Sequence, residues 1–164
     1  KRAGWLSVLF LGESLTAVAM GHFEAEIARA VVLALFVPLV ISSGGNSGGQ
    51  ATTLVIRAMA LGEVKLRDWW TVVKREFFAG LGLGTILATI GLVRIVVWEK
   101  FFHTYGPHYL ALAAAVSISL LGVVLWGTMV GSMLPFLLRR LGLDPATASA
   151  PFVATLVDVT GLII

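Results

Sequence analysis

Cysteine is absent from this 164-residue chain, and charged side chains are scarce. Without cysteine the chain has no disulfides, no thiolate metal ligands and no cysteine nucleophile. Charged residues make up 13% of the sequence and hydrophobic residues 58%, whereas a soluble domain is roughly a quarter charged. This composition excludes a water-soluble enzyme. It also excludes a nucleic-acid-binding domain. The net charge of +3 is explained by basic residues in the cytoplasmic loops of a membrane protein, and not by a surface that binds nucleic acid.

Long apolar segments dominate the sequence, and they predict an all-α membrane protein with five transmembrane helices. A span needs about 20 apolar residues. The expected spans cover residues 3–21, 30–56, 77–98, 109–138 and a last segment from about 146. We expect one transmembrane domain over residues 1–164, inserted as a multi-pass protein in the lipid bilayer of the cell (inner) membrane. Because the chain begins at Lys1 and ends in apolar residues, we expect a fragment whose last helix is truncated.

Basic residues alternate between the two sides of this arrangement and predict its orientation. Cytoplasmic loops carry an excess of Lys and Arg. One side would carry nine basic residues and the other three: Lys1, Arg2, Arg57, Lys65, Arg67, Lys74, Arg75, Arg139 and Arg140 against Arg29, Arg94 and Lys100. The N-terminus is therefore predicted to be cytoplasmic. Residues 63–76, which contain two tryptophans, fit either a connecting loop or an interfacial helix.

The second span is interrupted by Pro38 and by the polar, glycine-rich run 42–50. Irregular backbone survives at membrane depth only where it is buried in protein or lines a water-filled cavity. We interpret the run as an opened helix whose carbonyls and Asn46 amide face a permeation path. The alternative is a glycine segment used for tight packing. Glycine pairs four residues apart, 80/84 and 127/131, also predict close helix contacts.

A carboxylate in the middle of the fifth span is the second anomaly. Asp158 lies about 18 Å along the expected helix, where an unpaired charge costs several kcal/mol. Its side of the helix carries small residues, including Ala150, Ala154 and Gly161, so it can border a cavity. The alternative is a structural salt bridge or a protonated acid. Glu13 in the first span could extend the polar path, bind a second ion or be a buried protonated acid.

Catalysis is not expected. Residues 45–48 read Gly-Asn-Ser-Gly, the pattern around the serine of rhomboid-type intramembrane proteases. A serine nucleophile needs a base within hydrogen-bond reach, and all three histidines fall on the opposite side. An intramembrane aspartyl protease needs two carboxylates that share a site, and Asp158 has no second aspartate in any span.

The polar groups that remain form a hard, all-oxygen ligand set, which suits Mg²⁺ better than softer metals. Asp158 supplies one negative charge, so a homodimer that duplicates it across a two-fold axis would match a divalent ion. Mg²⁺ commonly keeps several of its waters and touches few protein ligands. Mn²⁺ or Co²⁺ would fit similarly.

Two long motifs resemble the MgtE magnesium channel family. The run from Pro38 to Gln50 is similar to its second-helix signature, and the segment from Asp144 to Asp158 is similar to its fifth helix. The resemblance implies a homodimer of five-helix subunits with a pore at the dimer interface. It further implies a central Mg²⁺ site at Asp158 and the Ala154 carbonyl, with Asn46 lining the pore. Full-length members carry cytoplasmic N-terminal and CBS regulatory domains, which this chain lacks.

We therefore predict magnesium transport by a homodimeric, Mg²⁺-selective channel with a central hydrated-ion site. The metal residues would be Asp158 and Ala154. The residues expected to line the pore are Asn46, Gly45, Ser47, Thr155 and Glu13. A secondary transporter that exchanges Mg²⁺ for Na⁺ or H⁺, with Glu13 as its coupling site, is the alternative. A membrane-embedded interaction subunit without a transport path is a third.

Overall fold

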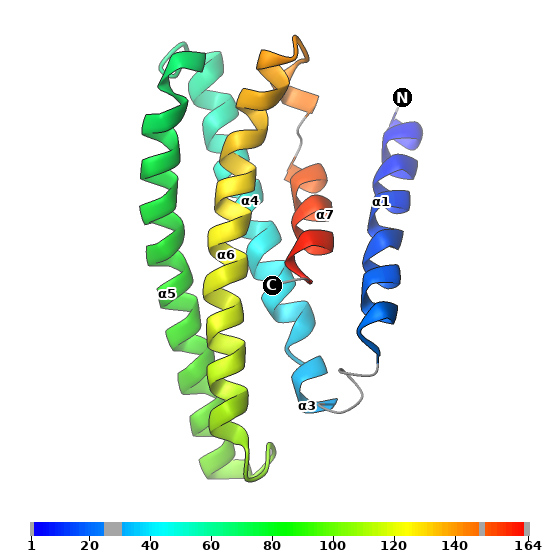
Figure 1. Ribbon diagram of the computed structural model, residues 1–164, viewed down its shortest axis with the longest axis vertical. Helices are drawn as coiled ribbons and strands as arrows, with labels where there is room; N and C mark the ends of the chain where they lie inside the picture. Colours follow the sequence, from blue (N-terminus) through cyan, green and yellow to red (C-terminus); the bar gives the residue numbers. More distant parts are fainter. Residues whose placement is uncertain (1, 25–30, 148–149, 163–164) are drawn as a thin grey trace.

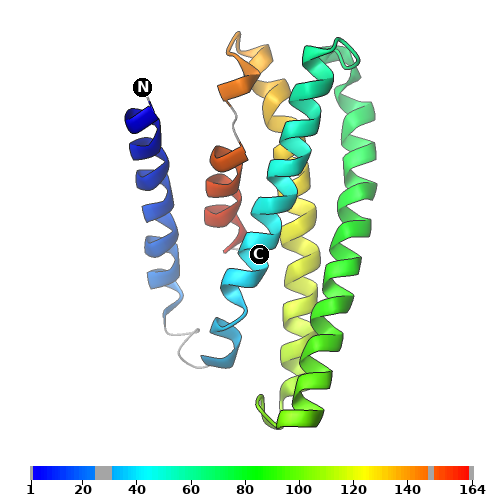
Figure 2. The same ribbon diagram turned by 180° about the vertical axis from the view of Figure 1, so that it is seen from behind.

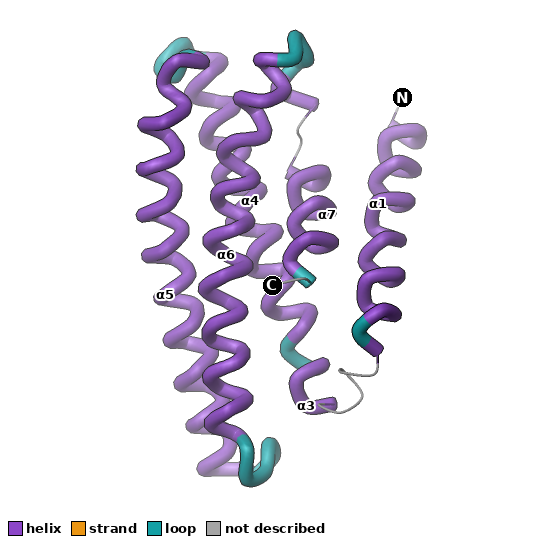
Figure 3. Tube along the Cα trace, in the orientation of Figure 1, coloured by secondary structure: helices purple, strands orange, loops and turns teal. Residues whose placement is uncertain are grey.

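The computed structural model describes residues 2–24, 31–147 and 150–162, and every regular element in these ranges is a helix. Figure 3 shows the helical trace, with short turns between helices. The elements are α1 (Arg2–His22), α3 (Val31–Ala34), α4 (Val37–Ala60), η1 (Leu66–Asp68), α5 (Trp69–Phe102), α6 (Tyr109–Arg140), η2 (Pro145–Thr147) and α7 (Ala150–Gly161). The all-α prediction is confirmed for the described part of the chain.

The long helices α4, α5 and α6 form a bundle, and α6 packs against both of the others (Figure 1). The short helix α7 lies on α4, and α1 stands at the edge of the molecule, where α7 is its main neighbour. The opposite view in Figure 2 shows the same separation of α1 from the bundle. Most side chains of α1 are consequently exposed within a single chain.

Four helical segments have the length and composition of membrane spans: residues 3–22, 31–60, 66–102 and 109–140. The fifth expected span corresponds to α7, an apolar helix of 12 residues. The structure thus supports four spans and a shorter apolar helix in the described ranges. Lys1 and Arg29, which entered the charge count, lie outside those ranges.

The glycine-rich run of the second span is helical, so the prediction that the helix opens at residues 42–50 is wrong. The span is instead broken just before Pro38, at the turn of residues 35–36 between α3 and α4. Helix α4 continues from Val37 to Ala60 without interruption. Pro38 lies in its first turn, where a missing N–H breaks no helical hydrogen bond. The packing alternative accounts for the glycines. Low helix propensity is outweighed here by tertiary contacts that only glycine permits.

Two glycines of α4 face two glycines of α6 at very close range. A Cβ atom at Gly127 would overlap the carbonyl of Gly44, and a Cβ atom at Gly131 would overlap the carbonyl of Gly48. Backbones can approach this closely only where side chains are absent, as in other small-residue pairs in membranes. The fully buried Thr52 adds to this contact, because its hydroxyl lies 2.8 Å from both the Gly48 and the Gly131 carbonyl oxygens.

The segment between the second and third spans differs from both expectations. Residues 63–76 contain a turn, the short helix η1 and the first two turns of α5, instead of one loop or one interfacial helix. The Asp68 carboxylate accepts a hydrogen bond of 2.9 Å from the Lys65 N–H. This bond stabilises the turn that starts α5, so Trp69 and Trp70 lie on the first turn of a membrane-spanning helix.

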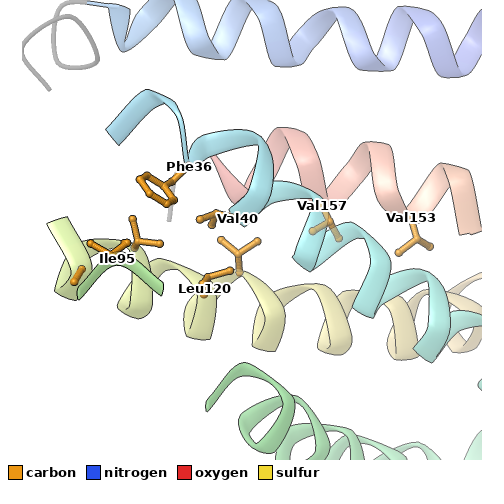
Figure 4. Close-up of a cluster of buried hydrophobic side chains, with 9 residues drawn as sticks. Phe36, Val40, Ile95, Leu120, Val153 and Val157 are labelled. Atoms are coloured by element: carbon orange, nitrogen blue, oxygen red, sulfur yellow. The ribbon is translucent and has the colours of Figure 1, made fainter. Parts of the chain in front are cut away.

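The core joins the bundle to α7. Val153 and Val157 of α7 are fully buried with residues from α4, α5 and α6, as Figure 4 shows for Val40, Ile95 and Leu120. Between α5 and α6, a Cβ atom at Gly84 would lie 2.9 Å from a methyl carbon of Leu121. The expected close contacts at both glycine pairs are therefore confirmed: the pair 80/84 packs α5 on α6, and the pair 127/131 packs α6 on α4.

Candidate ion-binding groove between α4 and α7

Helix α7 is held in a single rotational position by its buried side. Val153 and Val157 are each 0% exposed. The Trp126 indole N–H donates a 2.8 Å hydrogen bond to the Thr160 hydroxyl, which links α7 to α6. Ala154 and Asp158 follow these valines by one position, so they lie on an adjacent side of the helix. That side faces α4.

A second pair of glycines on α4 receives this side of α7. A Cβ atom at Gly45 would lie 3.1 Å from Asp158 Oδ1 and 3.4 Å from the Ala154 Cβ, and one at Gly49 would lie 3.2 Å from the Ala150 Cβ. The glycine doublets of α4, residues 44–45 and 48–49, therefore pack against two neighbouring helices. The first of each doublet faces α6, and the second faces α7. Larger side chains at 45 and 49 would separate the carboxylate from the α4 backbone.

The Asp158 carboxylate is unusual in having a buried oxygen without a partner. Oδ1 is inaccessible to solvent and accepts no hydrogen bond from any described residue. No described Lys, Arg or His forms a salt bridge with it either. A buried polar group without a hydrogen bond is costly, and a charged one more so. The site therefore offers an oxygen ligand with unsatisfied capacity to bind a cation.

Two adjacent cavities lie along this contact between α4 and α7. One of about 370 Å³ lies between α1, α4 and α7, and Asp158, Asn46 and Thr16 are among its lining residues. The other, of about 630 Å³, extends along α4 and α7 past Gln50 and Thr53. Gly45, Asn46 and Ala154 line both cavities. We call the two cavities together the α4–α7 groove.

The residues expected to line a pore divide into two groups. Asn46 and Gly45 line the α4–α7 groove together with the expected metal residues. Ser47 faces α6, where its hydroxyl lies 2.6 Å from the Thr128 hydroxyl. Thr155 faces α1, because a Cβ atom at Gly12 would lie 3.0 Å from its methyl group.

Glu13 is exposed on α1 and does not line either cavity. It is nevertheless near enough to Asp158 for the two carboxylates to interact electrostatically. On the side of α7 expected to be small, Ala150 and Ala154 border the groove, while Gly161 instead faces Val123 of α6. Gly161, less than one helical turn after Asp158, therefore belongs to the packing side of α7 and not to the groove.

The structure adds polar groove residues that the sequence did not single out. Ser42 and Thr16 line the smaller cavity, and the Asn46 amide lies 3.4 Å from the Ser42 hydroxyl. The spacing of Ser42 and Asn46, four residues apart, places them on one face of a helix. This spacing could have predicted Ser42 as a groove residue only if residues 42–50 had been expected to be helical. Thr16 could not have been predicted from the sequence, because its place in the groove depends on which face of α1 approaches α7.

The chain is similar to known proteins over nearly its whole length. Residues 37–164 match the MgtE family model, described as a divalent cation transporter. The chain is 44% identical over 163 residues to the magnesium transporter MgtE of Thermus thermophilus, covering 99% of this chain and 34% of the relative. It is 32% identical over 165 residues to MgtE of Enterococcus faecalis, covering 100% of this chain and 34% of that relative. It is 29% identical over 164 residues to MgtE of Bacillus subtilis, covering 100% and 35%.

The chain spans about a third of the length of these curated relatives. The family model covers most of the chain, including α4 to α7 and therefore both walls of the α4–α7 groove. Together with the four apolar helices, these matches lead to one conclusion: the chain is an integral membrane protein and belongs to the MgtE family of divalent cation transporters.

Proposed function

We propose that this chain transports Mg²⁺ as a homodimeric channel and that the ion passes along the α4–α7 groove. The observation that carries the proposal is Asp158, whose buried Oδ1 has no hydrogen-bond partner and whose side chain lines a cavity together with Asn46. A cation at that position would supply the missing electrostatic partner. The chemistry agrees with the magnesium transport named for the relatives.

The size of the groove favours an ion that keeps its water. At about 30 Å³ per water molecule, the cavity of about 370 Å³ beside Asp158 holds roughly 12 waters. Mg²⁺ dehydrates reluctantly and usually retains several of its waters in octahedral geometry. Asn46 and the Ala154 carbonyl would then bind the ion through its waters, while Asp158 supplies the charge.

Charge balance favours two copies of the chain. One Asp158 offsets only half the charge of Mg²⁺, and a second copy across a two-fold axis would contribute another. The groove side of α4 has surface available for such a partner, since Asn46, Gln50 and Leu54 are exposed. The cation would also relieve repulsion among Asp158, its copy and the nearby Glu13.

The membrane potential is a sufficient driving force for this path. Moving one charge across 100 mV is worth about 2.3 kcal/mol, so a divalent ion gains about 4.6 kcal/mol. Because the cytoplasmic side of the membrane is negative, this potential drives Mg²⁺ inward. No second ion gradient is required.

A secondary transporter is the alternative, and the position of Glu13 favours it. An exposed carboxylate near Asp158 could bind a proton or Na⁺ in exchange for Mg²⁺. Bilayer recordings distinguish the two mechanisms. Resolved single-channel currents carried by Mg²⁺ support the channel, and Mg²⁺ flux that is strictly coupled to a Na⁺ or H⁺ gradient supports the exchanger.

The direct test is Mg²⁺ uptake by proteoliposomes that contain Asp158→Asn. This change keeps the shape of the side chain and removes the charge, so we expect normal folding and dimerisation with uptake at background level. Glu63→Gln, at an exposed turn after α4 that lines neither cavity of the groove, is the matched control and should leave uptake unchanged. Asn46→Ala should reduce uptake less severely than Asp158→Asn.

Size-exclusion chromatography of each variant shows whether it is assembled. Wild-type uptake by a well-folded Asp158→Asn dimer would refute the site. A wild-type protein that passes no divalent ion in liposomes would refute the transport function itself and favour an interaction subunit.

A further inference from the structure

A second pocket lies outside the α4–α7 groove, where η1 and the start of α5 meet the end of α6. Its volume is about 530 Å³. We call it the arginine pocket, after the two arginines at its rim. Its lining includes Leu66, Arg67, Trp69, Phe136, Leu137 and Arg140. It shares no lining residue with the groove.

The floor of the arginine pocket is apolar. Phe136 is 6% exposed and packs in a small cluster with Val55, Met59 and Val72. Above this floor, Trp69 and Leu137 are half exposed within the chain, at 50% and 53%. A pocket whose apolar walls remain this exposed has room for a hydrocarbon segment that would cover them.

The rim is positively charged. The Arg67 side chain is 79% exposed, and its Nε lies 3.8 Å from Asp68 Oδ1. The other Asp68 oxygen already accepts the Lys65 N–H. The Arg140 side chain forms no salt bridge or hydrogen bond with any described residue. Two guanidinium groups therefore outweigh one partly engaged carboxylate, and their terminal N–H groups are available to an anion.

The sequence of α5 and α6 places the pocket at a membrane boundary. In α5 no charged residue occurs from Phe77 to Val93, and in α6 none occurs before Arg139. The pocket lies at the charged ends of these stretches, next to Trp69 and Trp70. Tryptophan is enriched at the headgroup level of membranes. The apolar floor would thus face the acyl region and the arginines the headgroups.

We propose that the arginine pocket binds one anionic phospholipid. The lipid phosphate would lie between Arg67 and Arg140, and the first part of an acyl chain would cover Phe136, Leu137 and Trp69. Arginine is suited to this role because its planar guanidinium donates two parallel hydrogen bonds to a phosphate. An anionic headgroup is favoured because the ammonium of a zwitterionic lipid would meet two like charges.

The bound lipid would connect two parts of the chain that are distant in sequence. Arg67 belongs to η1 at the start of α5, and Arg140 ends α6. An anion between them would relieve the repulsion of these cations and hold the two helix ends together. We therefore expect the lipid to stabilise the folded chain, and this expectation does not depend on the ion path.

The test is lipid binding to the full chain purified in detergent, measured by native mass spectrometry against phosphatidylglycerol and phosphatidylcholine. The pocket variant is the double substitution Arg67→Gln/Arg140→Gln. The matched control, Arg57→Gln/Arg139→Gln, removes two exposed charges, one from the last turn of α4 and one from the end of α6, without altering the pocket lining. With each arginine near an anionic lipid contributing about five- to sixfold in affinity, we expect about 30-fold weaker phosphatidylglycerol binding in the pocket variant only.

Thermal melting gives a second readout. Phosphatidylglycerol should raise the melting temperature of the wild type and of the control, but not that of the pocket variant. If the double variant does not fold, Arg140→Gln alone serves the same comparison. Equal loss in the control, equal binding of phosphatidylcholine, or full stabilisation by inorganic phosphate alone would each overturn the proposal.

Discussion

Substitution of one glycine at the α4–α6 contact tests how this fold holds its groove. In Gly131→Ala the new Cβ would lie 2.7 Å from the Gly48 carbonyl carbon and 2.8 Å from its Cα. Backbone atoms cannot move aside as a flexible side chain does, so α4 and α6 must separate. The separation also stretches the hydrogen bond of 2.8 Å between the Thr52 hydroxyl and the Gly131 carbonyl.

The expected cost combines three contributions. Overpacking costs about 1–3 kcal/mol, and weakening one hydrogen bond inside a membrane bundle costs about 0.6 kcal/mol on average. Alanine recovers up to about 1 kcal/mol through its higher helix propensity. The sum is a loss of about 1–3 kcal/mol in the free energy of unfolding. Because Gly45 and Gly49 of α4 face α7, the same shift should widen the groove and lower Mg²⁺ uptake.

The assay is equilibrium unfolding in mixed micelles, followed by circular dichroism, with uptake measured on the same preparations. Gly82→Ala is the control, because a Cβ atom at Gly82 of α5 would meet nothing within 4 Å. We expect this control to be as stable as the wild type or slightly more stable. If Gly131→Ala matches Gly82→Ala in stability, the close contact between α4 and α6 is not what holds them together.

Three further outcomes are expected. Thr52→Val should lower the free energy of unfolding by about 1 kcal/mol, measured in the same micelle assay, because the two carbonyls near its hydroxyl lose their donor. Glu99→Ala should lower the melting temperature, since the Tyr105 N–H loses the carboxylate oxygen that lies 2.6 Å away; Glu99→Gln should restore most of it. Initial rates of Mg²⁺ uptake should fall as pH is lowered, because a carboxylate must be deprotonated to bind metal; a flat profile would contradict a role for Asp158.

The membrane class of the protein was predictable because hydropathy is a local property. Each long apolar segment has to be covered by lipid or by another helix, whatever the tertiary arrangement. Residues 109–138 were expected as a span and lie within α6, and the glycines at 127 and 131 were expected to permit close contact. Those expectations needed only composition and a four-residue spacing.

The state of the glycine-rich run was not predictable in the same way. Its low helix propensity is a property of residues 42–50 alone, and it favoured an opened backbone. The structure keeps the helix because α6 lies against Gly44 and Gly48 while α7 lies against Gly45 and Gly49. Neither neighbour is visible from the run itself. Tertiary contact therefore reversed a local preference.

At the groove, residue types could be predicted from the sequence, but the direction in which each side chain points could not. That Asp158 is anomalous in an apolar segment, and that Asn46 is a suitable companion, followed from residue type and depth. That Ser47 instead faces Thr128, and Thr155 faces Gly12, depended on how each helix is rotated about its axis. Adjacent residues on a helix point about 100° apart. The buried valines of α7 and the glycine doublets of α4 decide which of them borders the α4–α7 groove and which packs against a neighbouring helix.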